Sequence, residues 1–345
     1  MDRQNFWRIT LDTNPDYCNL NCIMCEDHSP YGDSRETRKL QGRIRPQMDK
    51  GLLEKAIREA AILGVTEVIP STMGEPLLYP HFGLILDLCK ELDLKLNLTT
   101  NGTFPCRKKD HCVEHWAQQI VPICSDVKIS WNGASELIQH TIMGTSLDTH
   151  IDKARRFIAI RDNIASSTEH YCSMTMQLTF MRSNLNEIPK MVALAIKLGF
   201  DRIKGHQLWS HFPELEKQSL HNNLNWSQRW NTVVTECQSL VEGHQKKTGK
   251  TFILDNFHPL DISQSEKSEV EGSCPFLGKE IWVDPTGQLN VCCAPDQQRK
   301  SLGDFGSLTQ TTLSEMFTSD DYSYLRNNYL EFELCQQCRM RRPDA

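Results

Sequence analysis

The chain has 345 residues, of which 39% are hydrophobic and 24% charged, a composition typical of a globular protein. Its formal net charge of −6 argues against a dedicated nucleic-acid-binding protein, because such proteins usually present a basic face. The sequence has no apolar run of about 18 residues, and its first residues lack the apolar region of a signal peptide. We therefore expect a cytoplasmic protein with no membrane span and no nucleic-acid partner.

Short β-like segments alternate with amphipathic helical segments between residues 7 and 207. The β-like segments are at 7–11, 67–69, 95–99, 127–131, 175–180 and 202–204. Between them, apolar residues recur at helical spacing, as in the segments before Gly64 and Gly199. This alternation predicts an α/β fold with parallel strands and crossover helices, in a partial barrel or an open doubly wound sheet.

The pattern changes after residue 207. Residues 208–250 predict a polar helical stretch, and the Ser- and Glu-rich residues 263–273 predict an exposed linker. Residues 280–293 predict a β-hairpin whose turn is Asp284-Pro285-Thr286-Gly287, followed by a last helical segment. We therefore expect a core at residues 1–210, a helical region and linker at 211–273, and a small domain at 274–345.

The fourteen cysteines are unusual for a protein expected in the reducing cytosol. Clustered cysteines there indicate metal ligands or catalytic groups. Seven of them form two groups: Cys18, Cys22 and Cys25, then Cys274, Cys292, Cys335 and Cys338. Among the others, Cys106 and Cys112 share a loop with His111 and His115. A zinc site is conceivable there, but an ordinary surface loop is the simpler interpretation.

The first group follows the first predicted strand directly, with the spacing Cys18-x3-Cys22-x2-Cys25. Three thiolates favour an iron–sulfur cluster or zinc. Three ligands on a cubane cluster leave one iron open to an exogenous ligand. His28 could instead complete a zinc site, so these residues alone leave both possibilities open.

The run Cys18-Asn19-Leu20-Asn21-Cys22-Ile23-Met24-Cys25 resembles the CxxxCxxC signature of the radical S-adenosylmethionine (SAM) superfamily. The resemblance implies a [4Fe–4S] cluster bound by the three cysteines, with the amino and carboxylate groups of SAM on the fourth iron. It also implies that Met24 lies against the adenine of SAM.

Three later motifs follow successive predicted strands. Met73-Gly74-Glu75-Pro76 resembles the family's GGEP motif, which binds the methionine amino group of SAM, with Met73 as the departure. Thr99-Thr100-Asn101-Gly102 is similar to the T-N-G run near the ribose. Ser130-Trp131-Asn132-Gly133 resembles S-x-D/N-G, which faces the ribose or carboxylate. The implied cofactor-binding residues are Met24, Gly74, Glu75, Pro76, Thr100, Asn101, Ser130 and Asn132. The implied fold of residues 7–207 is a partial (β/α)6 TIM-like barrel.

The second group offers four cysteines, a complete set for a [4Fe–4S] cluster or a structural zinc ion. Its layout, Cys274…Gly287-x4-Cys292…Cys335-x2-Cys338, resembles the twitch domain, the shortened form of the SPASM extension of radical SAM enzymes. The resemblance implies one auxiliary [4Fe–4S] cluster in a small hairpin and helix domain. Cys293 would point to the opposite strand face from Cys292, so we leave it out of the ligand set.

The resemblance implies an enzyme that reductively cleaves SAM to a 5′-deoxyadenosyl radical and abstracts hydrogen from an unactivated carbon. An electron donor such as flavodoxin or ferredoxin is expected, and the auxiliary cluster favours a redox outcome. Our first hypothesis is an oxidoreductase acting on a small polar metabolite, because the 17 residues before Cys18 leave no room for a peptide-recruiting domain. The alternatives are a maturase of a peptide or protein side chain and a non-catalytic zinc-binding scaffold. The sequence identifies no catalytic acid or base.

Overall fold

A computed structural model describes residues 6–106, 111–221, 223–260, 262, 272–294, 296–338 and 340–341. The chain divides into two compact units. The first comprises Met1–Pro15, Arg45–Asn97 and Gln264–Ala345, and the second comprises Asp16–Ile44 and Leu98–Ser263. Within the described ranges, no helix is long and apolar enough to cross a membrane.

The first unit contains five strands in the hydrogen-bonded order β9-β8-β1-β2-β3. β1 (Arg8–Leu11) pairs in parallel with β2 (Glu67–Ile69), which pairs in parallel with β3 (Lys95–Thr100). The other edge of β1 pairs in parallel with β8 (Glu280–Val283), and β8 pairs antiparallel with β9 (Leu289–Asn290). The predicted hairpin is therefore confirmed, and it extends the parallel sheet beside β1.

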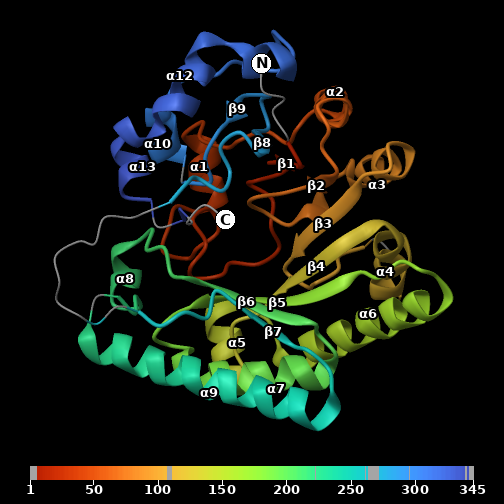
Figure 1. Cartoon of the computed structure of the whole chain (residues 1–345), viewed down its shortest axis with the longest axis vertical. Coiled ribbons are helices and arrows are strands. Elements are labelled where there is room, and N and C mark those ends of the chain that lie inside the picture. The colour runs from red at the N-terminus through yellow and green to blue at the C-terminus, as the bar shows by residue number, and fades with distance from the viewer. Residues whose placement is uncertain are drawn as a thin grey trace. The chain divides into compact units, whose positions relative to one another are not determined.

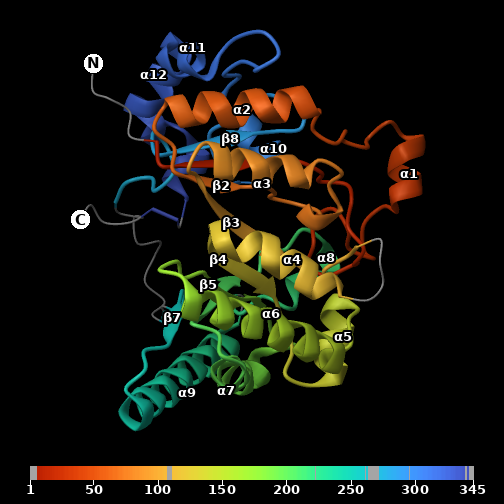
Figure 2. The same cartoon turned by 90° about the vertical axis from the view of Figure 1, so that its right-hand side faces the viewer.

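Two helices of the first unit, α2 (Lys50–Ile62) and α3 (Phe82–Glu91), each bury an apolar face. α2 begins at Asp49, whose carboxylate accepts hydrogen bonds from two backbone N–H groups, and it lies beside α3 (Figure 2). Glu315 completes a capping box at the start of α11. The helices that follow the hairpin are α10 (Asp296–Arg299), α11 (Leu313–Thr318), α12 (Asp320–Asn328) and α13 (Glu333–Gln336).

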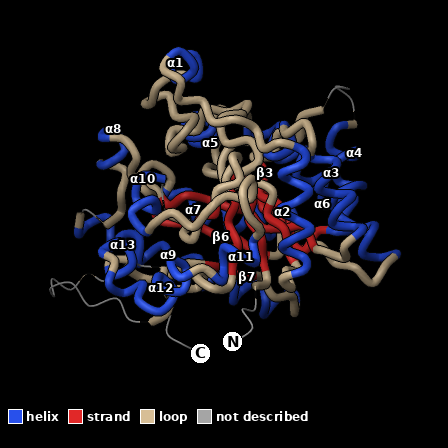
Figure 3. Tube along the Cα trace, turned by 90° about the horizontal axis from the view of Figure 1, so that it is seen from above, coloured by secondary structure: helices blue, strands red, loops and turns tan. Residues whose placement is uncertain are grey.

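The described part of the second unit contains four parallel strands after β3. Their order is β4 (Cys124–Ser130), β5 (Ser173–Phe180), β6 (Arg202–Gln207) and β7 (Ile253–Asp255). Helices α7 (Ile188–Leu198) and α9 (Leu224–Thr248) lie side by side on one face of β5, β6 and β7 (Figure 1). Helix α4 (Cys112–Ile120) lies beside α6 (Leu147–Ser167) (Figure 3). The remaining described helices of this unit are α1 (Arg35–Leu40), α5 (Glu136–Met143) and α8 (Pro213–Glu216).

The expected α/β partial barrel is confirmed. Six parallel strands, β1 to β6, are followed by helices, and the strand order ends at β7 on one edge and β9 on the other, so the sheet is not closed. The division at residues 210 and 274 stays a prediction. Most of the predicted linker at 263–273 lies outside the described residues.

Three predicted strand boundaries are wrong by two residues or more. One is the carboxyl end of β6, which lies at Gln207 rather than at 204, and the other two are amino ends. β4 begins at Cys124 and β5 at Ser173, earlier than the expected starts at 127 and 175. The added residues of β4 include Ser125 and Asp126, whose polar side chains hide the strand from a search for apolar runs. The structure also adds β7, a strand of three residues that the sequence analysis did not identify.

Candidate functional site

The three N-terminal cysteines lie in one loop of the second unit, between β1 and α1. The backbone N–H of Ile23 donates to the carbonyl of Ile142 at 3.0 Å, which ties the loop to α5. Inside the loop, the N–H of Cys25 donates to the carbonyl of Cys22 at 3.0 Å. Cys18, Cys22 and Met24 are half-buried, and they pack against a hydrophobic cluster formed by Leu20, Ile142, Met143, Met181 and Leu215. The loop is therefore held in place by packing and by backbone hydrogen bonds.

The three thiols are close enough to influence one another's charge. Burial raises the pKa of Cys22, and the negative charges that Cys25 and Cys18 would carry raise it further. Burial also raises the pKa of Cys25 to about 11. Three thiolates at this place therefore need the positive charge of a metal centre, since cysteine binds metal as the thiolate. The donor set fits the [4Fe–4S] cluster implied by the sequence motif.

The T-N-G run touches the cysteine loop directly. Nδ2 of Asn101 lies 3.6 Å from Sγ of Cys18 and 2.9 Å from Oδ1 of Asn19, to which it donates. The hydroxyl of Thr103 donates to Oδ1 of Asn101 at 2.6 Å. Thr100 is buried, and its hydroxyl accepts from the N–H of Gly102 at 3.3 Å. The network explains why the residues after β3 lie beside the cysteines.

Gly102 allows the turn after β3. Its φ of +74° lies in the left-handed region, and an added Cβ would lie 2.7 Å from Cε1 of His150. Nε2 of His150 lies 3.0 Å from the carbonyl oxygen of Ser130, and its ring packs edge-on against Trp131 at 4.5 Å. Burial lowers the pKa of His150 to about 4, so the ring is neutral near pH 7. His150 could not be predicted from the sequence, because a lone helical histidine gives no motif.

The predicted residues after β4 differ in exposure. Ser130 is half-buried, whereas Asn132 is fully buried. Oδ1 of Asn132 accepts from the backbone N–H of Thr179 at 2.9 Å. The backbone carbonyl of Asn132 accepts from Nδ2 of Asn184 at 3.2 Å. Asn132 therefore links the ends of β4 and β5. A contact of Ser130 and Asn132 with SAM stays a prediction.

The remaining predicted SAM residues belong to the first unit. Glu75 is fully buried, and its carboxylate caps a short helical turn by accepting from the N–H of Leu77 at 3.2 Å. Its carbonyl accepts from Nδ2 of Asn14 at 2.8 Å. Gly74 has a φ of +75°, and Pro76 begins the turn. These contacts fix the backbone of the predicted GGEP-like motif, whose role in binding SAM stays a prediction.

The four C-terminal cysteines lie close together within the first unit. The negative charges that Cys292 and Cys338 would carry raise the pKa of Cys274 and of Cys335. Burial raises the pKa of Cys335 to about 12. Backbone N–H groups point at two of the sulfurs, from Leu277 to Cys274 and from Ala294 to Cys292, both at 3.4 Å. Four cysteines near enough to influence one another's charge fit the donor set of a second [4Fe–4S] cluster.

Cys293 also lies near this group. A hydrogen bond with Cys293 lowers the pKa of Cys292 to about 6, while the same bond raises the pKa of Cys293. The expectation that strand alternation directs Cys293 away from Cys292 does not apply here, because β9 ends at Asn290. Whether Cys293 is a ligand stays a prediction.

In the part of the chain that the structure describes, no three His, Cys, Asp or Glu side chains are arranged to hold a single metal ion. Each cysteine of a [4Fe–4S] cluster binds a different iron, so this finding concerns single ions such as zinc.

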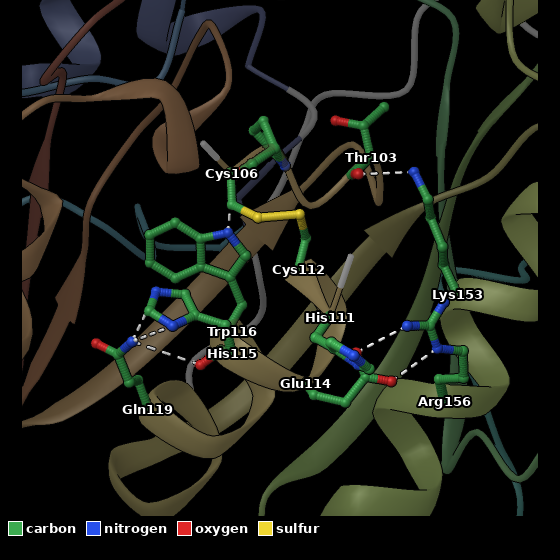
Figure 4. The surroundings of a disulfide bond; sticks show 11 residues. Thr103, Cys106, His111, Cys112, Glu114, His115, Trp116, Gln119, Lys153 and Arg156 are labelled. Atoms are coloured by element: carbon green, nitrogen blue, oxygen red, sulfur yellow. Dashed lines mark hydrogen bonds and ion pairs between the residues drawn. A yellow bond between two sulfur atoms is a disulfide. The ribbon is translucent and has the colours of Figure 1, made fainter. Parts of the chain in front are cut away.

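The loop of Cys106 and Cys112 holds a disulfide bond between these two residues (Figure 4). Cys112 is the first residue of α4, and the indole of Trp116, in the same helix, donates to the carbonyl of Pro105 at 2.8 Å. The interpretation of this segment as an ordinary surface loop therefore needs correction. The expected reducing environment disfavours a disulfide, yet these two cysteines, which are separated by 6 positions in the sequence, are paired.

Two family models match this chain. The model of the radical SAM superfamily matches residues 15–171, and the SPASM model, an iron–sulfur cluster-binding domain, matches residues 274–339. The matched ranges contain both cysteine groups.

Curated relatives align with nearly the whole chain. The PqqA peptide cyclase of Methylorubrum extorquens is 24% identical over 335 residues, which cover 95% of this chain and 76% of the relative. The tungsten-containing aldehyde ferredoxin oxidoreductase cofactor-modifying protein of Pyrococcus furiosus is 19% identical over 328 residues, which cover 94% of this chain and 85% of the relative.

Solved structures share the fold. SuiB of Streptococcus suis bound to S-adenosylmethionine has a TM-score of 0.65 at 17% identity, over 97% of this chain and 72% of that chain. The enzyme anSMEcpe with bound AdoMet has a TM-score of 0.62 at 13% identity, over 96% of this chain and 88% of that chain. The likeness to these structures concerns the fold, and the assignment to a family rests on the two family models, whose matched ranges contain both cysteine groups. The chain belongs to the radical SAM superfamily, carries a C-terminal SPASM iron–sulfur domain, and uses SAM and [4Fe–4S] clusters as its cofactors.

Proposed function

We propose that this chain is a peptide-modifying radical SAM enzyme, which abstracts hydrogen from a side chain of a peptide or protein. The observation that carries the proposal is the alignment of 95% of the chain with a PqqA peptide cyclase. Two structures of similar fold support it. SuiB bound to the precursor peptide SuiA has a TM-score of 0.65, and anSMEcpe with bound AdoMet and the Cp18Cys peptide has a TM-score of 0.63. The fold of this chain is thus one that holds peptides in other proteins.

The hypothesis of a small polar metabolite has weaker support. It depended on the short segment before Cys18, whereas the relatives named for their peptide substrates favour the maturase alternative. The zinc-scaffold alternative gains no support from two family models that describe iron–sulfur and SAM chemistry.

When bound, the reduced [4Fe–4S] cluster supplies the electron that splits SAM into methionine and a 5′-deoxyadenosyl radical. We assign Cys18, Cys22 and Cys25 as its ligands. Asn101 would hold Cys18 in place by hydrogen bonding to its sulfur, at the 3.6 Å separation seen between Nδ2 and Sγ. The half-buried Met24 would present an apolar surface to the adenine.

The proposed SAM contacts rest on the chemistry of each residue. The carboxylate of Glu75 suits the ammonium group of SAM, and the φ of +75° at Gly74 keeps the backbone beside it free of a side chain. Thr100, Ser130 and Asn132 offer hydroxyl or amide groups suited to the ribose or the carboxylate. Pro76 would fix the backbone that follows Glu75.

We propose one auxiliary cluster, with Cys274, Cys292, Cys335 and Cys338 as its ligands. A second iron–sulfur centre supplies electron transfer, which would suit a reaction that ends in oxidation of the peptide. The electron donor of the enzyme is proposed to be a flavodoxin or a ferredoxin.

The test uses anaerobically reconstituted protein with SAM and dithionite. Release of 5′-deoxyadenosine is measured by mass spectrometry with two fractions of a host-cell extract, one of peptides and proteins and one of small molecules. We expect the first fraction to stimulate release and prior digestion of that fraction to amino acids to remove the effect. Stimulation by the small-molecule fraction alone would contradict the proposal. The matched control is Cys22→Ala protein, which should release none.

A further inference from the structure

A cavity of about 360 Å³ lies in the C-terminal part of the first unit, among the elements drawn in blue in Figure 1. Its lining comes from the short helical turn Lys300–Leu302 and the residues after it, from helix α12, and from Phe332 before α13. Sites that bind small molecules or side chains begin at about 300 Å³. The cavity is therefore large enough to take a ligand group.

The buried part of the lining is apolar. Leu302, Phe305 and Leu325 are 5%, 6% and 2% exposed. Gly303 has a φ of +129°, and an added Cβ would lie 3.2 Å from Cζ of Phe305, so a side chain at this position would crowd the ring. Phe332 adds a half-buried ring. An apolar side chain that entered the cavity would thus bury its surface against apolar groups.

The exposed part of the lining is acidic and aromatic. Asp321, Tyr324 and Leu325 have the i, i+3, i+4 spacing that places side chains on one face of a helix. Leu325 is buried, whereas Asp321 and Tyr324 are exposed, so α12 contributes both an apolar wall and a polar rim. Asp304 is an exposed lining residue as well. The hydroxyl of Tyr324 donates to Glu331 at 2.7 Å, which brings a further carboxylate to this rim.

The two lining carboxylates have no cationic partner among the residues that the structure describes. Oδ1 of Asp304 accepts from the backbone N–H of Gly306 at 2.9 Å and from Nε2 of Gln288, and both donors are neutral. The side chain of Asp321 has neither a hydrogen bond nor an ion pair with a described residue. The first turn of α12 compensates only part of its charge. The rim therefore carries negative charge that would attract a cation.

We propose that this cavity binds the peptide substrate at an apolar side chain that has a lysine or arginine beside it. The apolar side chain would fill the cavity, and the cationic side chain would pair with Asp304 and Asp321 at the rim. The ring of Tyr324 also suits a cation, because cations are attracted to the faces of aromatic rings. The inference rests on the proposed function, since it takes the occupant to be the peptide. It makes Asp304 and Asp321 residues that determine substrate specificity.

The position of Phe332 connects this cavity to the proposed auxiliary cluster. Its backbone carbonyl accepts from the N–H of Cys335 at 2.9 Å, at the start of α13. A peptide bound in the cavity would therefore contact the same segment that carries a proposed cluster ligand.

The first test is ligand-detected saturation-transfer NMR on the reconstituted holoenzyme with SAM. The probes are acetyl-Lys-Phe-Lys-amide, acetyl-Lys-Ala-Lys-amide and acetyl-Glu-Phe-Glu-amide. We expect the first probe to bind most tightly, because only it has both the large apolar side chain and the positive charges. The double variant Asp304→Asn, Asp321→Asn should weaken its binding about fivefold. Asp320→Asn should leave binding unchanged, because Asp320 lies in the same turn of α12 and is not a lining residue.

The second test measures release of 5′-deoxyadenosine against the amount of the peptide fraction. The double variant should need about five times more of the fraction for half-maximal release, because it binds the peptide less tightly. Its maximal release should equal that of the wild type, because neither aspartate takes part in cleaving SAM. Asp320→Asn should behave as the wild type in both respects.

Circular dichroism verifies the fold of each variant. If the double variant does not fold, Asp321→Asn alone replaces it, because this side chain bonds to no described residue. Binding of the first probe no tighter than that of either other probe, unchanged binding by the folded variant, or an equal loss in Asp320→Asn would overturn the inference. If the peptide fraction stimulates release from protein that does not bind the first probe, only this inference fails and the proposed function stands.

Discussion

Asn101 donates a hydrogen bond from Nδ2 to the sulfur of Cys18, across a separation of 3.6 Å. The two residues come from different motifs, the run after β3 and the cysteine loop. Hydrogen bonds to the sulfurs are among the features that set the reduction potential of an iron–sulfur cluster, because they stabilise the more negative, reduced state.

Asn101→Ala should therefore lower the reduction potential of the cluster that we propose the N-terminal cysteines bind. One hydrogen bond of about 1 kcal/mol corresponds to roughly 40 mV for a one-electron couple. Redox titration followed by electron paramagnetic resonance measures the shift. Thr103→Val removes a neighbouring hydrogen bond to Asn101 and leaves the Asn101 side chain, so it serves as the control. An unchanged potential in Asn101→Ala would show that the contact does not tune the cluster.

His150 should make the protein less stable as pH falls. Its pKa is about 4 in the folded protein because of burial, against about 6.5 in an unfolded chain. Between these values the unfolded chain binds the additional proton, so the free energy of unfolding decreases as pH falls through this window. We expect a loss of about 2 kcal/mol between pH 7 and pH 5 from this residue.

Urea unfolding of wild-type and His150→Gln protein at the two pH values measures this contribution. The variant is expected to lose about 2 kcal/mol less than the wild type over the same range. Equal losses in the two proteins would mean that His150 titrates normally in the folded state.

The disulfide between Cys106 and Cys112 should stabilise the oxidised protein. Closing so short a loop in the unfolded chain is worth about 2 kcal/mol in the loop-entropy model. The double variant Cys106→Ser, Cys112→Ser should therefore unfold more easily by about that amount. Dithiothreitol should lower the stability of the wild type and leave that of the double variant unchanged. Alkylation and mass spectrometry test the bond itself, and two freely alkylated cysteines in unreduced protein would contradict it.

Cys292, rather than Cys293, should be the hairpin's ligand to the auxiliary cluster. Cys292 is half-buried and accepts a backbone hydrogen bond, whereas Cys293 is exposed. In a background that lacks Cys18, Cys22 and Cys25, Cys292→Ala should lose about four irons and Cys293→Ala should keep them. Iron and sulfide analysis measures both. The reverse result would exchange the roles of the two cysteines.

Much of the site could be predicted from the sequence, because its motifs are local. The spacing of Cys18, Cys22 and Cys25 and the polar runs that end β3 and β4 are each contained in a few residues. The pairing of β8 with β1 could not be predicted, because it joins segments about 270 residues apart and depends on register. β7 was missed since three residues, one of them Asp255, carry too little apolar signal.

The cysteines illustrate the same limit. Sequence spacing groups Cys274 and Cys292 with Cys335 and Cys338, and the structure brings these four close together. The position of Cys293 depends on where β9 ends, and the Cys106–Cys112 bond depends on how close the folded chain brings the two Cα atoms, which lie 5.6 Å apart. Neither is encoded by spacing alone. The substrate is likewise a property of the whole binding surface, which is why the sequence favoured a small metabolite and the relatives favour a peptide.

The most direct test of the central claim follows the hydrogen atom itself. Peptide and small-molecule fractions are prepared from host cells grown on deuterated nutrients and are given separately to the reconstituted enzyme with SAM and dithionite. The account predicts that 5′-deoxyadenosine gains deuterium from the deuterated peptide fraction and none from the deuterated small-molecule fraction. Deuterium gained only from the small-molecule fraction would contradict it.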